Sequence, residues 1–167
     1  VPPRFVYTKR STAAPAIKIA KPRVLVTAFP GTNSEYDTAL KFEQAGAAAE
    51  IFVLRNQTPE ALADSVAELE AKIKKSQIIA VPGGFSAGDE PDGSGKFMAA
   101  VFRNPKVKDA VHELLRSRDG LMIGICNGFQ ALIKSGLLPF GEIDVMTEES
   151  ATLTSNAIGR HESKMVR

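Results

Sequence analysis

Short runs of apolar residues alternate with helix-like stretches along most of the chain. Four runs, at 23–29, 49–54, 77–82 and 121–126, are continuous enough to be strands buried on both faces. Patterns typical of helices separate these runs. The alternation predicts an α/β domain, an open, doubly wound, mainly parallel sheet flanked by helices.

The first helix is expected between the first two strands. Thr32 or Asn33 is a suitable N-cap, and the pattern continues to about Gly46. The positions expected near its apolar face are Tyr36, Leu40 and Ala47.

The second helix has clearer boundaries. Thr58 can act as the cap, and Pro59 and Glu60 suit the first helical turn. Lysines at 72, 74 and 75 suit the negative end of the dipole, and we interpret them as a solvated helix end. Its apolar face is predicted to be Leu62, Val66, Leu69 and Ile73.

Two further helical stretches follow the third and fourth strands. The longer one covers about 94–118 and contains Pro105, where we expect a break. The other covers 127–136, directly behind the fourth strand.

The first 22 residues differ in composition from the rest. They hold four prolines, five basic residues and no acidic residue, which is typical of an extended linker or arm. A transit peptide is the weaker alternative, because the prolines disfavour an amphipathic helix. We expect residues 23–167 to be the N-terminal portion of a longer domain; a complete small protein with trimmed ends is the alternative.

Composition excludes several classes of function. A formal net charge of +2 gives no reason to expect nucleic acid or a membrane surface as partner. One cysteine forms no internal disulfide, and with two histidines it makes a zinc site improbable, so we expect no metal and a cytoplasmic protein. No apolar run approaches the roughly 20 residues that cross a bilayer.

Unusual segments follow three of the predicted strands. They are "FPGTN", "PGGFSAGDE" and "CNGFQ", each at a carboxyl end of a strand. Ligands of such sheets bind beyond those ends, at the switch point in strand order. We therefore expect the three loops to converge on one site.

Gly124-Ile125-Cys126-Asn127-Gly128 has the spacing of a nucleophile elbow with sulfur as the nucleophile. A strand-to-helix turn forces strained backbone geometry on Cys126, and the helix N-terminus favours its thiolate. The Asn127 amide can donate to an oxyanion, with a second donor from the Gly83-Gly84-Phe85 turn. The alternative is a small buried core residue.

Other candidate motifs fail on inspection. The segment "DGSGKF" is similar to a phosphate-binding loop, but Glu90 and Phe97 stand where glycine and a hydroxyl residue are required. His112 lies in the middle of a predicted helix, where a structural role is expected. His161 lies far from Cys126 along the chain, so a binding or structural role is favoured over that of a base.

From Arg23 onward the sequence resembles the class I, triad-type glutamine amidotransferases, whose fold is flavodoxin-like. The elbow and the Gly-Gly turn carry the general resemblance. The segments "GTNSEYD" and "GGFSAGDE" narrow it to the amidotransferase part of phosphoribosylformylglycinamidine synthases, and the late "LTSNAIGRHESKMVR" agrees. The linker-like arm favours the C-terminal part of the large single-chain form.

The resemblance implies an activity in purine biosynthesis. Cys126 would form a thioester with glutamine and release ammonia to a synthetase domain of the same polypeptide or complex. That partner domain would use ATP and Mg to convert formylglycinamide ribonucleotide to the amidine, and this domain would need no cofactor. The residues it implies are the oxyanion amides of Asn127, Gly84 and Phe85, and the substrate contacts Gln130, Gly83, Gly159, Arg160 and His161.

One departure from the family pattern limits this expectation. The family takes its catalytic histidine and glutamate from a late His-x-Glu segment, and none follows Cys126 in the expected place. We therefore expect the 167 residues alone to be catalytically impaired. Two alternatives stay open: a cysteine-dependent hydrolase of the deglycase or protease type, and a non-catalytic docking domain.

Overall fold

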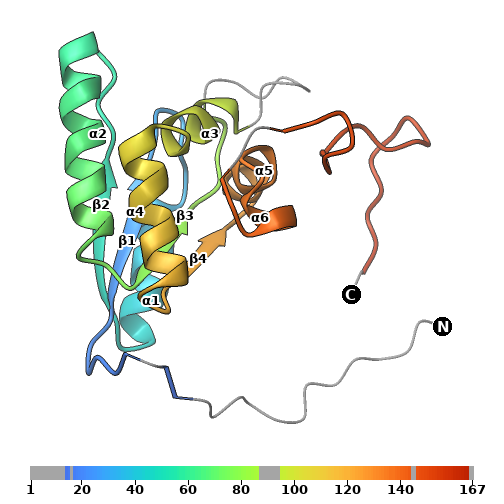
Figure 1. The fold of residues 1–167 in the computed structure, drawn as a ribbon. Helices are drawn as coiled ribbons and strands as arrows, with labels where there is room; N and C mark the ends of the chain where they lie inside the picture. Colours follow the sequence, from blue (N-terminus) through green and yellow to red (C-terminus); the bar gives the residue numbers. More distant parts are fainter. Residues whose placement is uncertain (1–13, 16, 87–94, 144–145, 166–167) are drawn as a thin grey trace.

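Four parallel strands form one sheet in the order β2-β1-β3-β4 (Figure 1), in a computed structural model of the chain. This confirms the predicted α/β class and places all four strands where the apolar runs predict them. The strands are β1 (Arg23–Ala28), β2 (Ala48–Val53), β3 (Ile78–Val81) and β4 (Leu121–Gly124). The residues that the structure describes are 14–15, 17–86, 95–143 and 146–165.

Helices cover the two faces of the sheet unequally. One face packs against α2, α3, α4 and α5, and the other against α1 (Figure 1). No helix in the described part of the chain is long and apolar enough to cross a membrane. The helices are α1 (Glu35–Gln44), α2 (Pro59–Ile73), α3 (Lys96–Phe102), α4 (Pro105–Arg116), α5 (Asn127–Lys134) and α6 (Leu137–Phe140).

Alternation along β1 explains the two cores. Leu25 joins the cluster under the larger helical layer, whereas Val24 and Val26 join the cluster under α1. All three are 1% exposed or less, because successive side chains of a strand point to opposite faces and this strand is covered on both. The continuous apolar run is therefore the expected pattern for a central parallel strand.

The second helix forms as its sequence predicts. The Thr58 hydroxyl accepts a hydrogen bond from the Ala61 backbone N–H at 3.1 Å, and Pro59 occupies the first turn. Leu69 and Ile73 are fully buried, and the two other predicted positions pack partly buried against the same core. The break at Pro105 is also confirmed, since α3 and α4 are separate helices.

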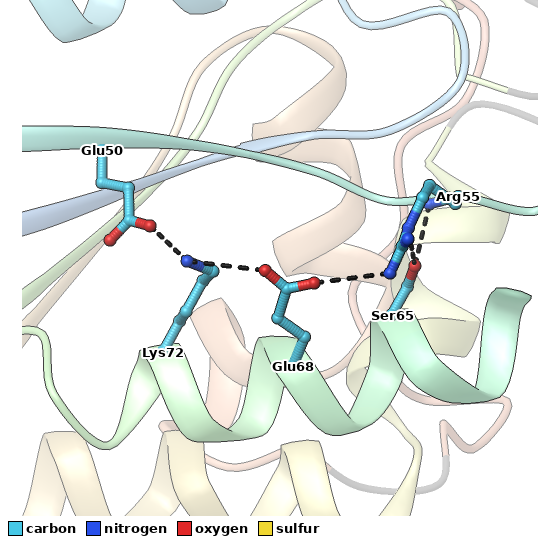
Figure 2. Close-up of polar contacts among 5 residues, drawn as sticks. All are labelled: Glu50, Arg55, Ser65, Glu68 and Lys72. Carbon is cyan, nitrogen blue, oxygen red and sulfur yellow. Dashed lines mark hydrogen bonds and ion pairs between the residues drawn. The ribbon is translucent and has the colours of Figure 1, made fainter.

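The side of α2 that faces β2 carries an ion-pair network that the sequence interpretation missed (Figure 2). Lys72 bonds Glu50 of β2 and lies 3.5 Å from Glu68, which in turn lies 3.5 Å from Arg55. The Arg55 backbone N–H donates to the buried Ser65 hydroxyl at 3.1 Å. Lys72 is therefore a cross-link between α2 and the edge strand rather than part of a solvated helix end.

The predicted apolar face of α1 is wrong in part. Tyr36 and Leu40 are 75% and 48% exposed, whereas Thr38 and Ala39 are buried against the sheet. The helix begins at Glu35, later than the predicted cap, because the preceding loop is held by bonds to other loops. The buried face of α1 is therefore formed by Thr38 and Ala39.

β4 is an edge strand whose outer face is open in the described part of the chain. Leu121 and Ile123 are 63% and 45% exposed, because the core cluster under α1 takes its strand residues from β1, β2 and β3 and none from β4. The expectation of a sheet covered on both faces therefore holds for its central strands and not for β4. Met122, on the opposite face, packs against the larger core.

Candidate active site

The loops after β1 and β3 meet at the switch point in strand order. β1 has β2 on one side and β3 on the other, so the chain order reverses between β1 and β3. An isolated antiparallel bridge joins Thr32 to Gly84 there. The Asn33 N–H donates to the Gly83 carbonyl at 2.9 Å, which ties the two loops together.

Cys126 occupies the junction between β4 and α5. Its side chain is exposed, and its backbone has φ 53° and ψ −108°, a conformation that non-glycine residues rarely adopt. The Gln130 N–H donates to the Cys126 carbonyl at 3.0 Å, which commits the following residues to the helix. The strained turn predicted for this residue is present, and the buried-core alternative for its sulfur is excluded.

The two glycines around Cys126 are required by close backbone approach. A Cβ built on Gly128 would lie 2.0 Å from the Val81 carbonyl oxygen. A Cβ built on Gly124 would lie 2.7 Å from the Gly128 carbonyl carbon and oxygen. The absence of both side chains therefore lets the start of α5 sit directly against β3 and β4.

The turn after β3 lies beside the cysteine. A Cβ built on Gly83 would be 3.2 Å from the Cys126 Cβ and 3.9 Å from its Sγ. Gly84 has φ +121°, and a Cβ there would be 2.4 Å from the Gly31 carbonyl oxygen. Bare backbone thus faces both the sulfur and the loop after β1, as the three-loop prediction requires.

The structure corrects one of the predicted oxyanion donors. The Phe85 N–H donates to the Gly31 carbonyl at 2.8 Å, so it is already committed to the loop bridge. In an antiparallel bridge of this type the N–H of Gly84 points away from Thr32, on the opposite side. Asn127 begins α5, where backbone N–H groups have no intrahelical acceptor. Gly84 and Asn127 therefore remain the candidate donors.

A buried polar connection links the loop after β3 to α5. The Ser86 hydroxyl and backbone N–H both donate to Asn127 Oδ1, at 2.7 Å and 3.2 Å. The Asn127 side-chain amide then donates to Gln130 Oε1 at 3.1 Å. Sequence reasoning missed the roles of Ser86 and of the Asn127 side chain, because 41 residues separate the two.

Apolar side chains on the loops of the site are unusually exposed. Phe85, Ile125 and Phe129 are 58%, 45% and 40% exposed, and each is next to or within a few residues of a site residue.

Three of the predicted substrate contacts lie in the C-terminal segment. Gly159, Arg160 and His161 are exposed there; the Gly159 N–H donates to the Asn156 carbonyl, and the Asn156 side-chain amide donates to the Arg160 carbonyl. Their contact with the amino-acid head group of glutamine stays a prediction. Residues 87–90 of "PGGFSAGDE" and 92–94 of "DGSGKF" lie outside the described residues.

His112 has the structural role predicted for it. Its Nε2 accepts a hydrogen bond from the Ile143 backbone N–H at 2.9 Å, which holds the chain after α6 against α4. Burial lowers the pKa of His112 from its usual 6.5, and the nearby cations Arg116 and Lys108 lower it further. The neutral imidazole that results is the form able to accept this bond at Nε2.

Comparison with known proteins places this geometry in a family. Residues 21–167 match the model of the CobB/CobQ-like glutamine amidotransferase domain. The chain belongs to this amidotransferase family.

Among curated proteins, this amidotransferase chain is similar to phosphoribosylformylglycinamidine synthase subunits PurQ. Identity is 37% over 146 residues with the Dehalococcoides mccartyi protein, covering 87% of this chain and 51% of that one. It is 38% over 152 residues with the Treponema denticola protein, covering 86% and 52%. The chain thus spans about half the length of these relatives.

A solved structure is also similar. The match is to a chain in the structure of PurLQS from Thermotoga maritima, with 29% identity and a TM-score of 0.46. It covers 70% of this chain and 45% of that chain.

Proposed function

We propose that this chain is the glutamine-hydrolysing part of a phosphoribosylformylglycinamidine synthase, with Cys126 as nucleophile. The observation that carries the proposal is the exposed sulfur on a strained strand-to-helix turn, next to the bare backbone of Gly83. Family membership and the names of the curated relatives support the substrate and the pathway.

The proposed reaction has two steps. The Cys126 sulfur attacks the side-chain carbonyl carbon of glutamine, the C–N bond breaks, and ammonia leaves with the transferred proton. Water then hydrolyses the thioester to glutamate and restores the thiol. The negative oxygen formed in each step is held by the backbone N–H groups of Asn127 and Gly84.

Ammonia would be used by a synthetase partner, in the same polypeptide or in a complex. That partner would bind ATP and Mg and convert formylglycinamide ribonucleotide to the amidine. The relatives are named as subunits of this synthase, which supports such a partner. The single-chain form of the synthase, suggested by the basic arm, belongs to this proposal.

Proton transfer from Cys126 requires a base, and neither histidine of the chain is placed to be that base in the described residues. His112 is bonded to Ile143, and His161 lies in the exposed tail; neither is hydrogen-bonded to Cys126 in the described part of the chain. General acid–base catalysis contributes roughly 10²–10⁴-fold. We expect the 167 residues alone to hydrolyse glutamine slower than a version containing the base by about that factor.

The test is labelling of Cys126 by an electrophilic glutamine analogue, followed by mass spectrometry. We expect labelling that L-glutamine suppresses, and none in Cys126→Ala. Iodoacetamide serves as the control for general thiol reactivity. A cysteine that reacts with iodoacetamide but ignores the analogue would refute the glutamine site and favour a different cysteine hydrolase. One that reacts with neither would favour a docking domain.

A further inference from the structure

Hydrogen bonds join the side chains of Ser86, Asn127 and Gln130 near Cys126. We call this hydrogen-bonded chain the relay, and its donors and acceptors have a defined direction. Ser86 is fully buried and Asn127 is 1% exposed, so neither exchanges its partners with water. Gln130 is half-buried one helical turn beyond the cysteine and ends the chain. Its position makes it the member that can contact a ligand.

The direction of this chain follows from one unambiguous donor. A backbone N–H can only donate, so the Ser86 N–H identifies the Asn127 atom it meets as the oxygen. The other arm of the Asn127 amide must then be the NH₂ group, which can only donate. It therefore faces the oxygen of Gln130, at 3.1 Å. The NH₂ group of Gln130 therefore points away from Asn127.

We propose that Ser86 and Asn127 are positioning residues that fix the polarity of Gln130, so that it offers N–H donors to an acceptor oxygen of the ligand. This rests on the proposed function, and in glutamine the acceptors are the side-chain carbonyl and the α-carboxylate. The same bonds attach the loop that carries Gly84 to the helix that carries Asn127. Both proposed oxyanion donors are therefore held in register by the chain that orients Gln130.

Gln130→Glu tests the orientation of the Gln130 amide without breaking the hydrogen bond from Asn127. One carboxylate oxygen still accepts from the Asn127 amide, while the other replaces the outward donor by a charged acceptor. We expect the glutamine concentration giving half-protection to rise on the order of 10- to 100-fold, as for a ligand oxygen left unpaired. Gln130→Met removes the outward donor and also the Oε1 that accepts from the Asn127 amide, so it breaks the hydrogen bond to Asn127 as well as the ligand contact, and it too should weaken protection.

Asn127→Asp tests the relay one step further back. Aspartate still accepts both Ser86 bonds but has no donor for the Gln130 oxygen. The Gln130 amide must then turn and present its oxygen to the ligand. We expect weakened glutamine binding of the same order, although the altered residue keeps its backbone N–H and the altered side-chain atom does not touch the ligand.

Binding is measured as protection of Cys126 from iodoacetamide by L-glutamine, which needs no turnover. A second measurement, hydrogen exchange of the side-chain NH₂ groups by NMR, needs no ligand. The relay predicts slow exchange for the Asn127 NH₂ and faster exchange for that of Gln130. Thermal unfolding of each variant shows whether the fold is retained.

The outcomes separate the two proposals. Equal protection of the wild type and Gln130→Glu would overturn the polarity inference and leave the glutamine site intact. Asn127 and Gln130 NH₂ groups that exchange equally fast would also overturn it. Failure of glutamine to protect the wild type, with the predicted exchange pattern present, would refute the proposed function while supporting the relay.

Discussion

Gly128 is the position at which the packing behind the nucleophile is most sensitive to a single methyl group. In Gly128→Ala the new Cβ would lie 2.0 Å from the Val81 carbonyl oxygen and 2.8 Å from that of Pro82. Both are backbone atoms next to a buried strand, so neither can rotate away. The substitution must displace α5, and with it Cys126.

The size of the displacement follows from the contact. Real Cβ atoms essentially never come closer than 3.0 Å to such an oxygen, so the helix must retreat by about 1 Å. Overpacking of this kind costs roughly 1–3 kcal/mol. Alanine is the better helix former by about 0.5–1 kcal/mol, so a loss of stability would appear against the trend of helix propensity. A misplacement near 1 Å can lower reaction with a positioned ligand about 100-fold.

Urea unfolding followed by circular dichroism measures the stability, and the glutamine-analogue labelling rate measures the geometry at the sulfur. Gly141→Ala is the control: its φ of +71° strains an alanine, but nothing lies within 4 Å of the new Cβ. We expect it to lose about 1–2 kcal/mol with no change in labelling. A Gly128→Ala protein as stable as the wild type, or labelled as fast, would refute the close-approach argument.

Two further predictions concern the scaffold. The folded state lowers the pKa of His112, so below pH 6.5 the unfolded chain binds a proton at this residue more readily than the folded chain does. The free energy of unfolding should therefore fall as pH decreases below 6.5, by at most about 1.4 kcal/mol per pH unit. Unfolding midpoints across this range should slope less in His112→Gln, and an identical slope would contradict the assignment. Lys72→Met should lose up to about 1 kcal/mol in urea unfolding, less at high salt, because it removes the cross-link to β2. Exposed Lys75→Met should lose none; equal losses would show that the network adds nothing.

Local sequence signals predicted the elements because they depend on neighbouring residues. The Thr58-Pro59 start of α2, the break at Pro105 and the four apolar strands all formed as predicted. Glycines at the spacing of an elbow around Cys126 also predicted its strained backbone, since a strand can turn into a helix that tightly only where side chains are absent.

Predictions that depended on distant partners were less accurate. Asn33, one of the two expected caps of α1, instead donates its backbone N–H to the Gly83 carbonyl of the loop after β3 at 2.9 Å. Lys72 was expected in solvent but meets Glu50, a residue of another element. Nothing local to either residue reports what the fold brings beside it.

The alternation of strand and helix patterns, together with the glycines around Cys126, was enough to define the architecture and the position of the sulfur. The strand order then decided which loops meet, and therefore that the Phe85 N–H bonds Gly31 and that Ser86 bonds Asn127. Apolar periodicity and turn chemistry are properties of adjacent residues. Hydrogen bonds between segments far apart in the sequence exist only once the sheet has placed those segments side by side.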